Sequence, residues 1–364
     1  MAAVPRIVPV DIPGAQYAIH VQAGLLQEAG PLIKRLAQTP TVALVTDSNL
    51  APLHAPTLLA SLESAGLRII RAVIPAGEGH KTLADATAIY DALLGAGIER
   101  STLLLSLGGG VVGDMAGFVA ATVLRGIPFV QIPTTLLAMV DASIGGKTGV
   151  NHPVGKNLIG AFHQPKAVLI DPAVLKTLPS RELRGGLAEC IKHEIIRDEA
   201  GFARLEENIA RALEVDVDYL SELVAHNVAI KAAVVQADPF ETGDRAHLNF
   251  GHTFGHAIET LSGYSYSHGE AVALGMVAAG KLAVSLGMID AAALQRIKAL
   301  IAKAGLPTGG LTLDTEQVLR EMMFDKKVRA GRVRFVLPVR LGSVVIRDDA
   351  PARLAREAID YLRG

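Results

Sequence analysis

The chain has little cysteine, few aromatic residues and almost no net charge. Of its 364 residues one is cysteine, Cys190, and none is tryptophan. A single cysteine excludes an intrachain disulfide and suits a reducing compartment. With 35 basic and 36 acidic side chains the formal net charge is −1, so no overall field would attract nucleic acid or an anionic membrane. Any site for an anion must therefore be assembled locally.

A long uninterrupted apolar segment is also missing. The amino terminus carries Asp11 and several prolines, and it lacks the apolar run of a signal peptide. The most apolar stretch, residues 271–288, is interrupted by Lys281 and rich in glycine and alanine. We expect it to form a buried, tightly packed helix and not a membrane span. The sequence thus predicts a soluble, cytoplasmic protein, which at this length divides into two domains.

Short β-rich runs alternate with helical patterns through the first half of the chain. Near-continuous apolar strands separated by helices are typical of parallel pairing, with helices covering both faces of the sheet. The sequence therefore predicts a doubly wound, mostly parallel Rossmann-like α/β domain at residues 1–178. The expected strands are 41–47, 68–74, 101–107, 128–133 and 167–171.

From Pro179 onward the apolar residues follow helical spacing. Helical patterns cover residues 181–213, 219–235 and 270–288. A β-hairpin is expected at 332–348, ahead of a closing helix. Residues 179–364 are therefore predicted to form a mostly helical domain with one short hairpin.

Polar or glycine-rich segments follow several of the expected strands. In doubly wound sheets, ligands bind beyond the carboxyl ends of the strands. Glycines let backbone N–H groups approach a pyrophosphate, and a carboxylate can accept hydrogen bonds from ribose hydroxyls. The glycine spacing differs from G-x-G-x-x-G, and a simple tight turn is the alternative. The segments that we assign to a dinucleotide site are 47–49 (DSN), 75–82 (PAGEGHKT) and 106–118 (SLGGGVVGDMAGF).

The stretch at 133–165 is rich in groups that bind anions. Lysines and asparagine amides at glycine-rich turns suit a phosphate or a carboxylate, and a solvated loop with surface lysines is the alternative. We expect its apolar residues to anchor it, namely Ile144, Val150, Val154, Leu158, Ile159 and Phe162. Its polar residues are Thr134, Thr135, Asp141, Lys147, Asn151, Lys156 and Asn157.

Three of the eleven histidines fall within LNFGHTFGHAIETLSGYSYSHGE, residues 248–270. His252 and His256 share a helical face, and two such histidines with a carboxylate from another helix form a zinc site. The H-E-x-x-H pattern is absent, which disfavours a protease. Spacing alone leaves two arrangements open. His252, His256 and His268 could all be ligands, or Glu189 could replace one of them and release it as a base.

Other charged residues of the second half carry weaker signals. His193 lies on the helical face of Glu189, and we interpret it as structural. Four cations come from three separate segments and would individually be surface residues, so their convergence on one anion is a hypothesis. They are Lys231, Arg245, Lys326 and Lys327.

Assembled in this order, the segments resemble the 3-dehydroquinate synthases of the sugar phosphate cyclase superfamily. The resemblance runs from the strand that ends at Asp47 to DKK at 325–327. It departs at Cys190 and His193, where many members have an aliphatic residue and tyrosine, and neither position has a catalytic role in the family. The motifs that carry it are GGGVVGDMAGF, IPTTLLAMVDASIGGKTGVN, GKNLIGAFHQP, GLAECIK, LNFGHTFGHAIE and HGEAVALGM.

The resemblance implies an NAD-dependent and metal-dependent carbon–oxygen lyase of the shikimate pathway, which leads to the aromatic amino acids. Its substrate would be 3-deoxy-D-arabino-heptulosonate 7-phosphate, and its products 3-dehydroquinate and phosphate. In the family's route NAD⁺ transiently oxidises the C5 carbinol and phosphate is eliminated. The hydride is then returned, and an intramolecular aldol reaction closes the ring. A homodimer is expected, without nucleic acid or membrane partners.

The resemblance also implies roles for individual residues. Glu189, His252 and His268 would hold one zinc or cobalt ion, which leaves His256 as an acid/base group. Catalysis would further use Lys147, Lys192, Asn157 and Arg245. Substrate would be bound by Asp141, Lys231, Asn249, one of Lys326 and Lys327, and Arg125 from a neighbouring subunit. NAD would be bound by Asp47, Asn49, Glu78, Lys81, Gly109, Gly110, Asp114, Thr134, Thr135, Lys156 and Thr177.

Three alternatives remain beside this interpretation. Another sugar phosphate cyclase would differ in its substrate contacts, especially at Asn249 and His256. A metal-dependent dehydrogenase of the glycerol dehydrogenase type would produce net NADH and would have little use for the segment from Lys147 to Asn157. A non-catalytic protein could retain the fold alone, but the intact ligand and cofactor positions argue against it.

Overall fold

The computed structural model describes residues 5–241, 243–324 and 333–364, which form two compact units. The first unit comprises Met1–Leu178 and Val217–Pro239, and the second comprises Pro179–Asp216 and Phe240–Gly364. The domain boundary predicted from the sequence, between residues 178 and 179, placed residues 217–239 in the second domain. The contacts of this segment correct that assignment, because its helix packs on strands of the first unit.

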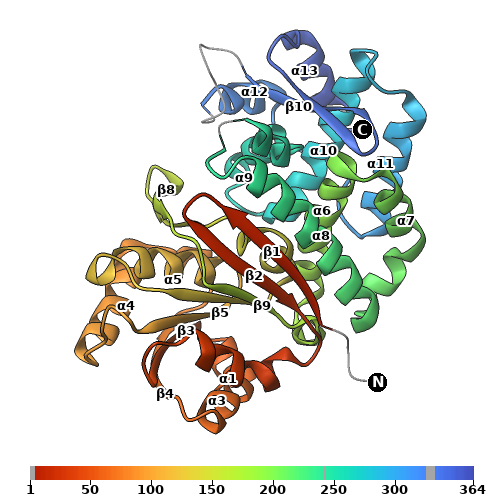
Figure 1. Cartoon of the computed structure of the whole chain (residues 1–364). Coiled ribbons are helices and arrows are strands. Elements are labelled where there is room, and N and C mark those ends of the chain that lie inside the picture. Colours follow the sequence, from red (N-terminus) through yellow and green to blue (C-terminus); the bar gives the residue numbers. More distant parts are fainter. Residues whose placement is uncertain (1–4, 242, 325–332) are drawn as a thin grey trace. The chain divides into compact units, whose positions relative to one another are not determined.

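The first unit is built on a seven-stranded sheet with the order β1-β2-β9-β6-β5-β3-β4 (Figure 1). Strand β1 is antiparallel to β2, and every other neighbouring pair is parallel. Leu44, Leu105 and Val130 pair across three central strands and are fully buried. The strands are β1 (Arg6–Ile12), β2 (Ala15–Val21), β3 (Thr41–Asp47), β4 (Arg68–Ile74), β5 (Leu103–Gly108), β6 (Phe129–Pro133) and β9 (Ala167–Ile170).

Helices cover both faces of this sheet, which confirms the doubly wound α/β prediction. Helices α1 and α3 pack against each other on one face, and α4 and α5 pack on the other (Figure 1). Helix α8 packs against β1 and the short π-helix η3 (Ala138–Ala142). The helices are α1 (Leu25–Leu36), α2 (Leu50–Leu53), α3 (Ala55–Ser64), α4 (Leu83–Gly95), α5 (Gly110–Thr122) and α8 (Val217–Ala237).

The stretch at 133–165, which the sequence predicts to bind anions, contains a hairpin as well as η3. Strand β7 (Lys147–His152) pairs antiparallel with β8 (Gly155–Phe162) in a separate two-stranded sheet. Gly149 lies opposite Gly160, and a Cβ on Gly160 would lie 2.2 Å from the Thr148 carbonyl oxygen, so the pairing requires glycine there. Ile144 and Val150 are buried as predicted. Three of the predicted anchors are instead exposed: Val154, Leu158 and Phe162.

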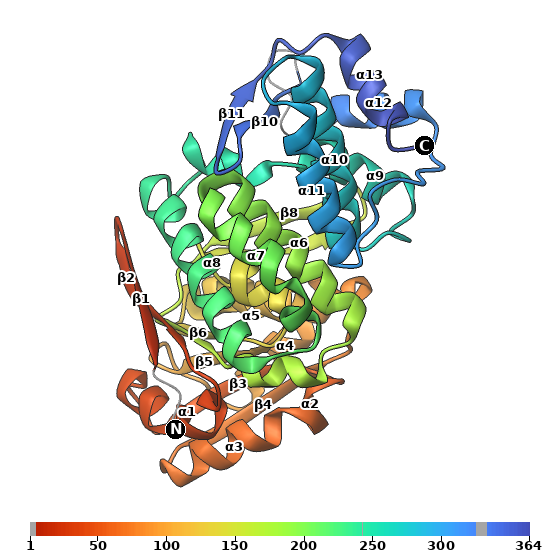
Figure 2. The ribbon, with the colours of Figure 1, turned by 90° about the vertical axis from the view of Figure 1, so that its right-hand side faces the viewer.

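The second unit is helical and has α10 at its centre. Helix α10 packs against α6, α9, α11, α13 and β10, and Figure 2 shows it alongside α11. The predicted hairpin is present as β10 (Phe335–Arg340) and β11 (Ser343–Arg347). The helices are α6 (Ser180–Arg197), α7 (Glu199–Leu213), α9 (His252–Leu261), α10 (His268–Ser285), α11 (Ala291–Lys303), α12 (Thr315–Phe324) and α13 (Ala352–Asp360).

Glycines bring α9 and α10 into close contact. A Cβ on Gly275 would lie 1.9 Å from the carbonyl oxygen of Gly251, and a Cβ on Gly255 would lie 3.0 Å from that of Ala271. Larger residues would separate the two helices. The close approach holds the first turn of α9 against α10. Among the described residues, no helix combines the length and hydropathy that a membrane span requires.

Candidate functional site

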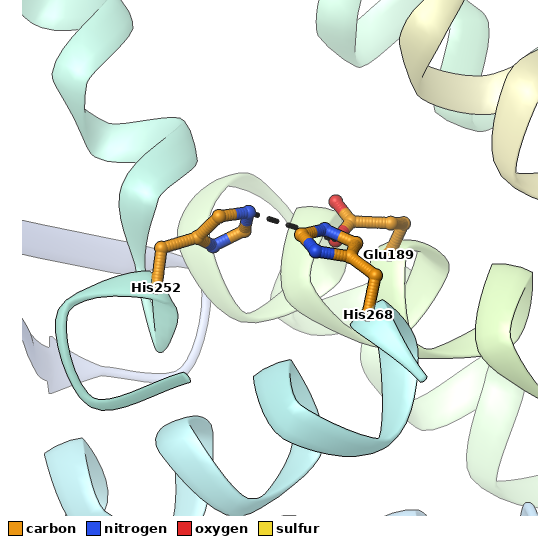
Figure 3. Close-up of side chains that lie close together, drawn as sticks. All are labelled: Glu189, His252 and His268. Atoms are coloured by element: carbon orange, nitrogen blue, oxygen red, sulfur yellow. Dashed lines mark ion pairs between the residues drawn. The ribbon is translucent and has the colours of Figure 1, made fainter. Parts of the chain in front are cut away.

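Three helices of the second unit bring Glu189, His252 and His268 together (Figure 3). Glu189 comes from the middle of α6, whereas His252 and His268 are the first residues of α9 and α10. Glu189 Oε1 lies 3.9 Å from His252 Nε2 and 3.6 Å from His268 Nε2. One ligand atom from each residue lies within 4.8 Å of the others, so the three can share one metal ion.

The second nitrogen of each histidine has its own partner. His252 Nδ1 lies 3.1 Å from the Phe250 carbonyl oxygen, and His268 Nδ1 lies 3.2 Å from Glu259 Oε2. A metal-ligating histidine typically donates its other ring N–H to a carbonyl or carboxylate, which fixes its tautomer and orientation. Both rings therefore present Nε2 to Glu189. A buried carboxylate and two such imidazoles form a donor set that fits zinc or cobalt.

The electrostatic surroundings of the two histidines differ. Burial, together with the Lys192 ammonium, holds the pKa of His252 well below its ordinary value. Burial also lowers the pKa of His268, but hydrogen bonds to Glu189 and Glu259 outweigh it and raise that pKa to about 9. The raised pKa means that a proton and a metal ion compete for His268. The competition arises because a metal ion binds the neutral imidazole.

Lys192 and Cys190 flank Glu189 on α6. Lys192 forms an ion pair with Glu189, and both side chains are almost completely buried. Burial is the main cause that raises the pKa of the Cys190 thiol well above its ordinary value. A thiol that stays protonated is a poor nucleophile and a poor metal ligand. Cys190 is therefore a core residue in spite of its place beside Glu189.

Other predicted residues of the second unit lie on α9 and the segment before it. The His256 ring centroid is 5.3 Å from that of His252 and 6.2 Å from that of His268. Arg245 is buried in the 3₁₀ segment Asp244–Asn249. Asn249 Nδ2 donates to Glu241 Oε1 at 2.9 Å. The histidines are thus grouped as the sequence predicted, whereas Lys326 and Lys327 lie outside the described residues.

In the first unit, several residues predicted to bind NAD lie at or just after the carboxyl ends of parallel strands. Asp47 Oδ1 accepts hydrogen bonds from the backbone N–H groups of Asn49 and Leu50, at 2.8 and 3.0 Å. Gly109 follows β5 directly and precedes Gly110, the first residue of α5. A Cβ on Gly109 would lie 3.0 Å from the side chain of Thr135, so this close approach favours glycine, and the helix start is of the kind that binds anions.

A buried lysine connects the segment after β4 to α5 and to β8. Lys81 Nζ donates to Asp114 Oδ2 at 2.6 Å and to Asn157 Oδ1 at 2.5 Å. Burial raises the pKa of Asp114, although the nearby Lys81 ammonium opposes this shift. Asn157 has a φ of 54°, a left-handed conformation that asparagine tolerates. Asn151 makes a further contact between the same segments, because its side chain donates to Glu78 Oε1, in the segment after β4, at 2.7 Å.

Helix α8 supplies a second buried lysine to the first unit. Lys231 Nζ donates to the Asp141 carbonyl oxygen at 2.6 Å and to its carboxylate at 2.5 Å. The ion pair joins α8 to η3. A pair from such distant positions in the sequence has no local signal, and the two residues were predicted as separate substrate contacts.

The remaining predicted residues of the first unit are less closely grouped. Thr134 is buried after β6, and the Thr177 hydroxyl lies 2.7 Å from His54 Nε2. Lys147 is exposed at the start of β7, and Lys156 is half-buried in β8. Arg125 is exposed in a turn with a φ of 66°.

Two residues around these sites were not assigned to NAD, metal or substrate by the family resemblance. Asn151 connects Glu78 to β8, since its side-chain oxygen also accepts from the Asn157 N–H at 2.9 Å. Glu259 orients His268. Glu259 lies three residues after His256, where the helical repeat places it near the same face, so spacing alone could have pointed to it.

Comparisons with known proteins identify the family of the chain. The family model described as 3-dehydroquinate synthase N-terminal matches residues 71–185, and the C-terminal model of the same name matches residues 186–328. A 3-dehydroquinate synthase from Microcystis aeruginosa is 50% identical over 355 residues, which cover 97% of each chain.

Solved structures show the same fold. A 2-epi-5-epi-valiolone synthase from Streptomyces hygroscopicus subsp. jinggangensis 5008, with NAD⁺ and Zn²⁺ bound, is 30% identical with a TM-score of 0.89. The match covers 98% of this chain and 99% of that one. A 2-deoxy-scyllo-inosose synthase matches at 23% identity and a TM-score of 0.89, over 97% and 99% of the two chains. Both likenesses extend over both units.

Proposed function

The chain belongs to the 3-dehydroquinate synthase family, and on that premise we propose that it converts 3-deoxy-D-arabino-heptulosonate 7-phosphate to 3-dehydroquinate and phosphate. One observation carries the proposal. Glu189, His252 and His268 meet on three helices in a chain that is half identical, over nearly its whole length, to a 3-dehydroquinate synthase. The activity is that of a carbon–oxygen lyase in the shikimate pathway.

The cofactors are assigned to separate units. Glu189, His252 and His268 hold one zinc or cobalt ion, and the glycine-rich edge of the parallel sheet holds NAD. The similar valiolone synthase, with NAD⁺ and Zn²⁺ bound, supports both assignments. When bound, the ion supplies Lewis acidity toward substrate hydroxyls, and NAD⁺ supplies a hydride acceptor that is restored within each turnover.

The residues assigned to NAD have distinct tasks. The N–H groups at the start of α5 bind the pyrophosphate, and the Asp47 carboxylate accepts from a ribose hydroxyl while its Oδ1 holds the turn. Lys81 and Asn157 keep the β7–β8 hairpin against the loop after β4. The NAD set is Asp47, Asn49, Glu78, Lys81, Gly109, Gly110, Asp114, Thr134, Thr135, Lys156 and Thr177.

The residues assigned to substrate balance its two anionic groups. A carboxylate and a phosphate call for several cations, which a chain with a net charge of −1 must gather locally. Arg125 would act from the second copy of a homodimer. The substrate and proton-transfer set is Asp141, Lys147, Asn157, Lys192, Lys231, Arg245, Asn249, His256, one of Lys326 and Lys327, and Arg125.

His256→Ala is expected to lower turnover by roughly 10²- to 10⁴-fold while the metal stays bound. The ring of His256 is close to both histidine ligands but is not needed in the three-residue ligand set. The measurement is the rate of phosphate release beside the metal content after gel filtration. A variant that loses its metal would show that the roles of His252 and His256 are assigned wrongly.

Glu259→Gln is expected to weaken metal binding roughly tenfold, since loss of the carboxylate charge leaves His268 a less basic ligand. The dissociation constant can be measured by competition with a chromophoric chelator. Glu206→Gln, on α7, is the control, because Glu206 pairs with Arg296 and not with a ligand. Equal affinities in the wild type and Glu259→Gln would contradict the orienting role.

The test of the proposed function is phosphate release from the heptulosonate phosphate by purified protein. The assay is run with and without NAD⁺, and after chelation followed by return of the metal. We expect phosphate and 3-dehydroquinate to form together, without net NADH and only with both cofactors. Net NADH without phosphate would place the chain with the dehydrogenases. Turnover of sedoheptulose 7-phosphate alone would place it with another cyclase.

A further inference from the structure

We propose that Arg181 is a positioning residue for the metal site, because together with Glu270 it fixes the start of α10, and hence His268, against α6. The inference rests on the proposed function in one respect, namely that Glu189, His252 and His268 bind a metal ion. Arg181 lies two helical turns before Glu189, and Glu270 lies two residues after His268.

Helices α6 and α10 are joined by a bidentate ion pair between Arg181 and Glu270. Arg181 Nε donates to Glu270 Oε1 at 3.0 Å, and Arg181 Nη2 donates to Glu270 Oε2 at 2.6 Å. Nη2 also donates to the Ser265 carbonyl oxygen at 2.8 Å. The planar guanidinium thus binds the first turn of α10 and the loop before it at once, and a lysine could not reproduce that geometry.

Glu270 has a second task at the same place. It is the third residue of α10, and its Oε2 accepts from the Ser267 backbone N–H at 2.8 Å, while Ser267 Oγ accepts from the Glu270 N–H at 3.4 Å. This reciprocal capping box fixes the point at which the helix begins. His268 is the residue directly after the cap. One carboxylate therefore sets both the start of α10 and its contact with α6.

Three contacts follow one another along the line where α6 meets α10. Arg181, Gly185 and Glu189 are four residues apart and share a face of α6. Their partners are the consecutive residues 270, 269 and 268. Between the ion pair and the ligands, a Cβ on Gly269 would lie 2.4 Å from Gly185 Cα. The two backbones are in direct contact there, so the ion pair can set the helix register without an intervening side chain.

A small displacement of α10 matters because metal–ligand distances tolerate only about 0.2 Å. Arg181 is 57% exposed, and an exposed ion pair contributes little to global stability. Its loss should therefore change the position of His268 more than the stability of the fold. This expectation separates a positioning role from a merely structural one.

The test compares Arg181→Ala with Arg296→Ala. Arg296 forms an ion pair of the same kind between α11 and α7, with Nε 3.3 Å from Glu206 Oε1 and Nη2 2.5 Å from Glu206 Oε2, and it is 43% exposed. For each variant the cobalt dissociation constant, the visible absorption of the bound cobalt and the thermal midpoint are measured. We expect Arg181→Ala to bind cobalt roughly tenfold more weakly, with altered absorption bands. Arg296→Ala should keep the wild-type affinity and spectrum.

A second pair of variants addresses the glycine contact. Gly269→Ala places a methyl group against the backbone of α6, whereas a Cβ on Gly185 meets no atom within 4 Å. We expect Gly269→Ala to weaken cobalt binding at least as much as Arg181→Ala does. Gly185→Ala should bind cobalt like the wild type.

Each outcome bears on the proposal. Wild-type affinity and spectrum in Arg181→Ala, or an equal loss in Arg296→Ala, would overturn the positioning role and leave the metal site intact. Arg181→Lys keeps the positive charge but not the two parallel hydrogen bonds of the guanidinium to Glu270. Partial recovery of cobalt affinity in this variant would support the positioning role. If His268→Ala bound cobalt as tightly as the wild type, the metal site itself would be wrong, and the positioning role with it.

Discussion

His268→Ala is expected to remove the metal and the activity together. The substitution leaves Glu189 and His252 as the only members of the ligand set, and it also removes the partner of Glu259. Loss of Lewis acidity amounts to several kcal/mol of transition-state stabilisation, so activity should fall by about 10³-fold or more. The measurements are metal content after dialysis and the rate of phosphate release.

The matched control is His20→Ala, on β2 of the first unit, which should retain its metal. His268→Ala with full metal occupancy and normal turnover would rule out the ligand role. Loss of activity with the metal retained would instead make His268 an acid/base group.

Gly275→Ala is expected to destabilise the second unit by about 3 kcal/mol, because the new methyl group would lie 1.9 Å from the Gly251 carbonyl oxygen. Neither backbone can move without separating α9 from α10. His252 begins α9 one residue after Gly251, so metal affinity should fall as well. Urea denaturation followed by circular dichroism gives the change in stability.

Gly185→Ala is the control for this effect, since it also adds one methyl group to a helix interior of the same unit but meets open space. It should unfold at the wild-type urea concentration or above, because alanine favours a helix more than glycine does. An unchanged midpoint in Gly275→Ala would mean that the close packing of α9 and α10 is not required.

The sheet was predictable because its central strands are buried on both faces. Their apolar residues run almost without interruption, which is a strong local signal. The hairpin of β1 and β2 escaped prediction because its polar residues, together with Pro9, weaken that signal in an edge strand. Strands β7 and β8 escaped it for another reason. Glycines that usually indicate a loop serve there to let two backbones approach, as at Gly149 and Gly160.

The candidate site was predictable in its residue types but not in its pairings. Residue spacing left open whether His252, His256 and His268 are all ligands or Glu189 replaces one of them, and only the family resemblance named Glu189, His252 and His268. The positions of α6, α9 and α10 bring ligand atoms of these three residues together, and such positions depend on contacts between distant segments. The ion pairs of Lys231 with Asp141 and of Arg181 with Glu270 are likewise tertiary contacts, and no local sequence pattern encodes them.

Helix α8 has a consequence for how the gene can be divided. The chain leaves the first unit at Leu178, returns to it at Val217 and leaves it again after Pro239. A fragment that ends at Leu178 would lack the helix that packs on β1, and Asp141 would lose Lys231. We therefore expect neither half to be expressed as a stable module by cutting the gene once. If the two units were exchanged between related enzymes, the coding sequence of α8 would have to be transferred together with that of the first unit.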